Sequence, residues 1–242
     1  MSAPLDWIVD EGEQYAVVTV HGRLDMPGAS RLRQTLMKCL AEQPGALLVD
    51  LSDMQDAGAT SLSVFTAVAR QAATWPGTAV LLCAPPEVAA RLQGGRYGVL
   101  AVHSSLDAAR LAIAEGPPVT QRVIDHLLPV TGAVRHARDL ATDACAKWGL
   151  PHLVGPACLI VSELVTNAVE HAGTMIVLEL RHRDRKVHIA VRDGSPEMPR
   201  MIPQAPADRE RGRGMLLIDN IATSWGALPS RDGKVVWATL TA

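Results

Sequence analysis

The sequence predicts an α/β domain over residues 1–115 and an α+β domain over residues 122–242, joined by a linker at 116–121. Its length of 242 residues fits two domains of ordinary size better than one. A glycine followed by two prolines, Gly116 to Pro118, cannot continue a helix and is typical of a linker. Short apolar segments alternate with helical ones before this point, whereas two helices precede the strands after it.

The first domain is expected to form a sheet with helices on its face, because strand and helix patterns alternate along it. A turn is expected from Gly22 to Gly28. The last helix should begin after a capping serine, Ser104 or Ser105. The strands are predicted at 14–20, 46–52, 78–83 and 99–102, and the helices at 28–42, at 57–73, from Pro85-Pro86 and after the capping serine.

The second domain is expected to be a two-layer arrangement of helices and a mostly antiparallel sheet. A segment rich in Pro, Arg and Gly, 194–214, interrupts it. The helices are predicted at 131–148, 156–172 and 214–222, and the strands at 174–182, 186–193, 224–229 and 234–241.

Composition narrows the classes of function. Apolar residues make up 48% of the chain and charged residues 20%, which is typical of a globular protein with a core. The net charge of −2 gives no broad basic surface for nucleic acid. Four cysteines without C-x-x-C spacing are expected to be free buried thiols in a reducing cytosol. Neither a signal peptide nor an apolar run near 18 residues is present, so we expect a cytoplasmic protein with no membrane span.

The helix that contains SELVTNAVEHA carries the most informative polar residues. Glu163 and Asn167 lie one turn apart, opposite an apolar stripe. The amide oxygen of Asn167 suits Mg²⁺, which binds few protein ligands. The carboxylate of Glu163 can orient or deprotonate a nucleophile. The stripe consists of Ala157, Val161, Leu164, Val165, Ala168, Val169 and Ala172.

Two glycine-containing segments follow that helix. Asp193, at a strand end before Gly194, can accept a hydrogen bond from an exocyclic amine such as adenine N6. Gly212 and Gly214 open a helix and let the backbone approach phosphate, and Arg213, Arg209 and Arg211 add positive charge. Each feature alone also suits a solvated surface, a turn or a loop, but their order favours a nucleotide site. The P-loop pattern G-x-x-x-x-G-K-[ST] is not present in the sequence.

These segments resemble the motifs of the GHKL-type ATPases. ELVTNAVEHA looks like the N box, VRDGSP like the first glycine box and GRGMLLID like the second. Within that superfamily the chain is most similar to anti-sigma factor serine kinases. The resemblance implies bound ATP and Mg²⁺, with Asn167 holding the metal and Glu163 as general base. It also implies that Asp193 contacts adenine, that Gly212 and Gly214 form part of the phosphate lid, and that Gly194 and Arg213 belong to the nucleotide site.

The sequence departs from the usual glycine boxes in two places. The first box usually reads D-x-G-x-G, whereas Asp193 is followed here by Gly194, Ser195 and Pro196. The second box contains a single G-x-G.

The first domain resembles the STAS domains of anti-sigma factor antagonists over about residues 5–115. The segment LLVDLSDMQDAGATSLSVF is similar to their phosphoacceptor region. In antagonists a serine follows this strand, where the start of a helix stabilises a phosphate. Gly58 takes that position here, so the domain is expected to be degenerate. Thr60 and Ser61 lie close by and are interpreted as ordinary hydroxyls of an early helical turn.

Together the resemblances imply a bacterial regulator of transcription that works through protein partners. The leading hypothesis is a kinase that phosphorylates a serine or threonine of a partner STAS antagonist while sequestering a sigma factor. A non-catalytic partner-switching scaffold with weak or no nucleotide binding is the alternative, and a plain ATPase is a third hypothesis. The expected partners are a sigma factor, an antagonist or both, with no nucleic acid or membrane. A homodimer is also implied.

Overall fold

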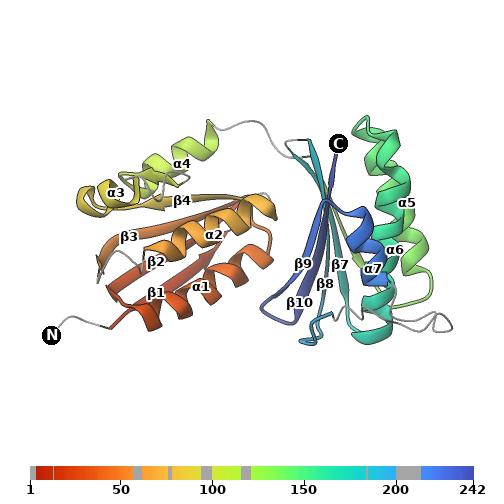
Figure 1. Ribbon diagram of the computed structural model, residues 1–242, viewed down its shortest axis with the longest axis horizontal. Coiled ribbons are helices and arrows are strands. Elements are labelled where there is room, and N and C mark those ends of the chain that lie inside the picture. Colours follow the sequence, from red (N-terminus) through yellow and green to blue (C-terminus); the bar gives the residue numbers. More distant parts are fainter. Residues whose placement is uncertain are drawn as a thin grey trace. The chain divides into compact units, whose positions relative to one another are not determined.

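The computed structural model describes residues 4–12, 14–56, 62–75, 78–93, 100–115, 121–183, 185–199 and 214–242. The chain divides into two compact units, Met1–Pro118 and Val119–Ala242 (Figure 1). Each unit has its own five-stranded sheet.

The first unit is a mixed sheet in the order β1-β2-β3-β4-β5, with β1 antiparallel to β2 and the remaining pairs parallel. Its central strand β3 is apolar and buried on both faces, since Leu47, Leu48 and Val49 are fully inaccessible. The predicted α/β class is therefore confirmed. Its elements are β1 (Asp6–Glu11), β2 (Tyr15–Leu24), α1 (Met26–Ala41), β3 (Ala46–Asp56), α2 (Ser63–Thr74), β4 (Ala79–Cys83), α3 (Pro86–Gln93), β5 (Ala101–His103) and α4 (Leu106–Ala114).

The predicted turn from Gly22 to Gly28 is wrong. Strand β2 continues to Leu24, because Gly22 pairs with Met54 in an extended β3. A register shift precedes Gly22, whose φ of 80° suits glycine. Helix α1 then begins at once, capped by Asp25, whose Oδ1 accepts a hydrogen bond from the Gly28 amide at 2.7 Å.

The last helix of this unit begins directly after Ser105, one of the two serines that the sequence offered as its N-cap. Ser105 is the N-cap of α4, and its hydroxyl accepts a hydrogen bond from the Ala108 amide at 3.1 Å. The candidate phosphoacceptor positions Gly58, Thr60 and Ser61 lie outside the described residues.

The second unit is an antiparallel sheet in the order β6-β7-β8-β10-β9, with α5, α6 and α7 against one face (Figure 1). Helix α6 packs on β8 and β10, and Val161 and Leu164 of α6 share one core with Ile189 of β8 and Val236 of β10. The predicted α+β class is confirmed. The elements are β6 (Gln121–Leu127), α5 (Ala133–Lys147), the 3₁₀ turn Pro151–Leu153, α6 (Val154–His171), β7 (Ile176–Arg183), β8 (Lys186–Asp193), α7 (Gly214–Ile221), β9 (Ser224–Pro229) and β10 (Lys234–Thr241).

Strand β6 precedes the helices and was not predicted. Gln121, expected to close the linker, is its first residue. The strand lies at a sheet edge, and only Val123 and Leu127 of its residues join the core. A polar edge strand of this kind carries almost no period-two signal.

Within the described residues, one helical segment, Pro151–His171, is long and apolar enough to cross a membrane. Length and composition alone are weak evidence for a span, because core helices of soluble domains share them. Ala157, Ile160, Val161 and Leu164 of this segment belong to the core of the second unit. Part of this segment therefore lies in the core of the second unit.

Candidate nucleotide site

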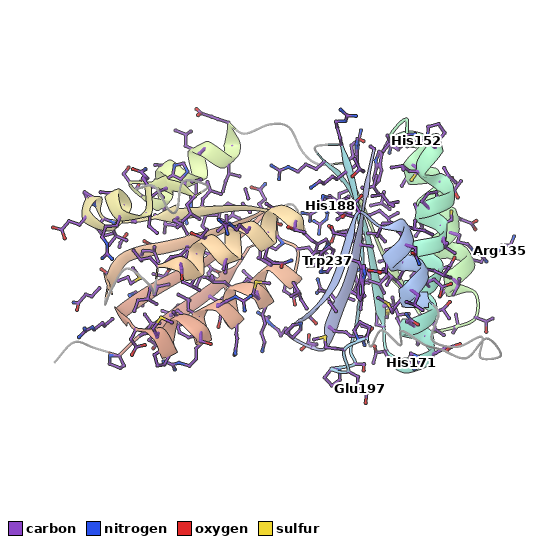
Figure 2. The ribbon with its side chains drawn as sticks, in the orientation of Figure 1. Arg135, His152, His171, His188, Glu197 and Trp237 are labelled. Atoms are coloured by element: carbon purple, nitrogen blue, oxygen red, sulfur yellow. The ribbon has the colours of Figure 1, made fainter. Side chains whose placement is uncertain are left out.

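Helix α6 presents Glu163 and Asn167 to the start of α7. Of the predicted apolar stripe, Ala157, Val161, Leu164, Val165 and Ala168 are buried, whereas Val169 and Ala172 are half-buried. The two polar residues are also half-buried and do not lie on an open solvated face. Glu163 faces Gly214, and Asn167 faces Met215. The last turn of α6 and the segment after β8 meet at one end of this unit. His171 and Glu197 mark that end, opposite His152 (Figure 2).

Gly214 packs directly on the carboxylate of Glu163. A Cβ at this position would overlap Oε2 of Glu163 and lie 3.3 Å from its Cδ, so a larger residue here would require the Glu163 side chain to move. Within the part of the chain that the structure describes, the Glu163 carboxylate has no hydrogen-bond partner. Burial raises its pKa above the usual range of a glutamate. A carboxylate of this kind is a stronger base than an exposed one.

Only the nitrogen of the Asn167 side-chain amide has a hydrogen-bond partner among the described residues. Its Nδ2 donates to Sδ of Met215 at 3.8 Å, a weak contact that orients the amide. Its Oδ1 has no partner among the described residues. An amide oxygen left open in this way is the donor type that Mg²⁺ prefers.

Asp193, at the end of β8, is buried, whereas an aspartate in a turn is usually exposed. Its side chain is 3% exposed and forms an ion pair with Lys234 of β10, whose Nζ lies 2.8 Å from Oδ1. The same oxygen accepts a hydrogen bond from the Ser195 amide at 2.8 Å. Oδ2 has no hydrogen-bond partner within the described ranges. One acceptor of this carboxylate is therefore satisfied and one is open.

Two glycines let the backbone close around Asp193. The Gly194 amide donates to Oγ1 of Thr174 at 2.8 Å, and a Cβ there would lie 2.9 Å from Cγ2 of the same threonine. A Cβ on Gly233 would overlap the carbonyl oxygen of Asp193 and lie 2.6 Å from Cα of Gly194. Larger residues at either position would displace the segment after β8.

Lys234 and Thr174 were missed by sequence reasoning. Lys234 is 41 residues from Asp193, and a charged residue opening an apolar strand gives no local sign of a partner. The pair exists because β10 and β8 pair with Lys234 opposite Asp193. Only the antiparallel register could have identified it.

The structure does not describe all the predicted site residues. Gly212 and Arg213, with Arg209 and Arg211, lie outside the described residues. Among the described residues, no cluster of three or more His, Cys, Asp or Glu side chains is arranged to hold a metal ion. Helix α6 contacts both β8 and α7, so one helix connects the three predicted segments.

Two family models match the chain. Residues 7–100 match the family described as Mlab, STAS domain, and residues 129–240 match the histidine kinase-like ATPase domain. No curated protein matches.

Among solved structures, the chain is similar to an anti-sigma factor antagonist from Mycobacterium paratuberculosis, with 26% identity and a TM-score of 0.41. That match covers 47% of this chain and 99% of the other. It is also similar to the antagonist SpoIIAA in its unphosphorylated form, with 12% identity and a TM-score of 0.39, over 47% of this chain and 100% of the other.

The chain is a STAS domain fused to a histidine kinase-like ATPase domain. Both predicted resemblances are confirmed at the level of the domain family. Proteins with the second domain typically bind ATP with Mg²⁺. The combination of the two domains indicates a partner-switching regulator.

Proposed function

We propose that this protein binds ATP with Mg²⁺ and phosphorylates a serine or threonine of a separate STAS antagonist, while sequestering a sigma factor. One observation carries the proposal. Glu163 has a half-buried carboxylate with no hydrogen-bond partner in the described residues, one helical turn from an open amide oxygen of Asn167. A helix surface that served only for packing would have no need of two adjacent, half-buried acceptors without a protein partner.

Each proposed role follows from the chemistry of the side chain. Asn167 binds Mg²⁺ through Oδ1, and Asp193 accepts a hydrogen bond from the base through Oδ2. Glu163 takes the proton from the attacking hydroxyl, which is a weak nucleophile without a base. Bound ATP supplies the phosphoryl group, and Mg²⁺ neutralises charge on the phosphates. Gly212, Arg213 and Gly214 line the phosphates, with Gly194 beside the base.

The proposed partners are proteins. A sigma factor, an antagonist or both would bind the ATPase domain, in the cytoplasm and without nucleic acid or membrane, and the chain is proposed to form a homodimer. The domain pair supports protein partners, because the two domain types imply partner-switching interactions.

One observation favours a non-catalytic scaffold instead. Asp193, the proposed base contact, already forms an ion pair with Lys234. If that pair fills the place of the base, nucleotide would bind weakly or not at all. The protein would then hold its partners without phosphoryl transfer.

Two measurements separate the functions. The first is the melting temperature of the full chain with millimolar ATP, with and without Mg²⁺. The second is transfer of labelled phosphate from ATP to STAS proteins recovered by pull-down from the native cell. Mg²⁺-dependent stabilisation with transfer supports the kinase, and an unmoved melting curve supports the scaffold. Binding without transfer to any bound antagonist defines a nucleotide-gated binding module.

A further inference from the structure

The loop from α6 to β7 lies beside the turn that follows β8. Gly173 ends α6 in a left-handed conformation, with a φ of 60°, and its amide donates to the Ala168 carbonyl oxygen at 3.3 Å. Thr174 is the next residue, and its Oγ1 accepts a hydrogen bond from the Gly194 amide at 2.8 Å. One hydroxyl therefore ties the end of α6 to the turn after β8.

Strand pairing does not hold Gly194 in place. On this side of the sheet the β8–β10 ladder ends at Asp193, and the β7–β8 ladder ends one residue earlier, at Arg192. Gly194 therefore lies beyond both ladders, and glycine has the least restricted backbone of all residues. The Thr174 hydroxyl supplies a tie at the point where the ladders have ended.

The conformation of Gly194 affects where the Asp193 carboxylate lies. Oδ1 of Asp193 accepts from the Ser195 amide at 2.8 Å, a hydrogen bond that spans the backbone of Gly194. Lys234 donates to the same oxygen at 2.8 Å and to the Ser195 carbonyl oxygen at 3.3 Å. A rotation at Gly194 would move Ser195, and with it two of these three hydrogen bonds. Holding the Gly194 amide therefore keeps Oδ1 engaged and leaves Oδ2 as the open acceptor.

The contact between Thr174 and Gly194 is close. A Cβ on Gly194 would lie 2.9 Å from Cγ2 and 3.1 Å from Oγ1 of Thr174. Gly194 is exposed, so water can satisfy its amide almost as well as a protein group. A hydroxyl at this place therefore adds little to the stability of the fold, and its main effect is to restrict the orientation of the turn.

We propose that Thr174 is a positioning residue of the nucleotide site. Its hydroxyl fixes the Gly194 amide, and Asp193 thereby presents its open oxygen to the 6-amino group of the adenine base. Because Thr174 directly follows the end of α6, it also relates this base contact to the helix that carries Asn167. The inference rests on the proposed function, since it requires that the base binds at Asp193.

The test compares ATP with purine riboside triphosphate, which lacks only the 6-amino group, by titration calorimetry on the full-length chain with Mg²⁺. The ratio of the two dissociation constants measures the hydrogen bond from that amino group to Asp193. For the wild type we expect purine riboside triphosphate to bind at least about tenfold more weakly than ATP, the effect of one hydrogen bond to a charged group. The ratio is internal to each variant, so a partial loss of folded protein cancels.

Thr174→Val removes the hydroxyl and keeps the shape of the side chain, whereas Thr174→Ser keeps the hydroxyl. In Thr174→Val the ratio should fall at least about threefold, because ATP loses a well-placed acceptor and purine riboside triphosphate has no amino group to lose it. Thr174→Ser should keep the wild-type ratio. Thr142→Val is the matched control, because the Thr142 hydroxyl donates to the Arg138 carbonyl oxygen of α5 at 2.8 Å, and it should also keep that ratio.

A role confined to folding would weaken both nucleotides equally. An unchanged ratio in a folded Thr174→Val would therefore overturn the inference and leave the proposed function standing, as would an equal fall in Thr174→Ser. If Thr174→Val does not fold, Thr174→Ala removes the same hydroxyl and gives the same comparison.

The wild type alone separates the two remaining outcomes. If it binds ATP and purine riboside triphosphate equally well, Asp193 does not bind the 6-amino group and the inference fails, while nucleotide binding stands. If it binds neither nucleotide, both the inference and the proposed function are wrong.

Discussion

Two buried carboxylates of the ATPase domain, Glu179 on β7 and Asp193 at the end of β8, differ in how fully they are satisfied. Oε1 of Glu179 accepts from Arg122 at 2.7 Å and from Arg181 at 2.7 Å, and Oε2 accepts from Arg122 at 3.0 Å. Both of its oxygens are thus paired. Asp193 is buried to the same degree but has one oxygen with no partner in the described residues.

The number of carboxylate oxygens that have partners distinguishes charges that maintain the fold from charges that are available to a ligand. A buried charge is tolerated when every lone pair has a partner, and an additional ligand would then have to displace one. Asp193 can accept a ligand without losing a bond. Glu163, which has no partner within the described residues, is more open still. The open carboxylates lie in the predicted motifs, and the saturated one lies outside them.

The largest effect on stability is expected at the saturated carboxylate. Glu179→Ala leaves the buried Arg181 without its carboxylate and should lower the free energy of unfolding by about 3–5 kcal/mol. Denaturant titration measures this loss. The affinity of the folded fraction for ATP should stay within about threefold of wild type.

Asp193→Asn is the matched control for that variant. It should weaken ATP binding at least tenfold, about the effect of one hydrogen bond to a charged group. Equal loss of ATP affinity in the two variants would show that saturation does not distinguish structural from binding carboxylates.

Glu163→Gln tests the most open carboxylate. The amide keeps the shape of the side chain but loses the basic lone pair. Phosphoryl transfer to a cognate STAS partner should fall at least about a hundredfold, because general-base assistance typically contributes about 10²–10⁴-fold. ATP binding should remain within a few-fold. Transfer at the wild-type rate, measured in single-turnover assays, would exclude Glu163 as the base.

Asn167→Ala removes the proposed Mg²⁺ ligand. With ATP at a hundredfold excess over its dissociation constant, the wild type should gain about 2.7 kcal/mol of stability by mass action. The Mg²⁺-dependent part of that gain should vanish in the variant, as read from melting curves with and without Mg²⁺. If the variant keeps the full Mg²⁺ response, the metal is held by other residues.

A smaller effect, on the pH dependence of stability, is expected from Glu163, because burial raises the pKa of its carboxyl. A carboxyl whose pKa is raised in the folded chain binds more protons there, so its contribution to stability is favourable at low pH. That contribution is lost as pH rises from the pKa of the unfolded chain through the raised pKa. Glu163→Gln should therefore melt higher than wild type above this window and at the same temperature below it. A constant difference across the pH range would contradict this origin.

The smallest effect is expected in the STAS domain, where Gly58 offers no hydroxyl. Incubation of the full chain with ATP should leave residues 1–118 without stoichiometric phosphate, as mapped by mass spectrometry. Stoichiometric label on Thr60 or Ser61 would show that the domain is a competent acceptor.

Local patterns predicted most of the fold and half of the site. The Glu163 and Asn167 pair was visible because four residues make about one helical turn. Strand β8 was visible because its apolar residues and the following Asp-Gly mark its end. By contrast, β6 was missed because its exposed Ile124 and half-buried Asp125 break the apolar alternation that marks a strand, and the end of β2 was misplaced because β3 extends beyond its apolar run.

By itself, the sequence determined which side chains are on which elements: a carboxylate and an amide on one helix, an aspartate at a strand end and a glycine at a helix start. The tertiary structure alone decided which acceptors are open. Pairing between β8 and β10 brings Lys234 to Asp193, and packing of α7 on α6 sets Gly214 against Glu163. The physical reason is that satisfaction of a buried charge depends on groups distant in sequence, whose approach is set by strand register and helix packing.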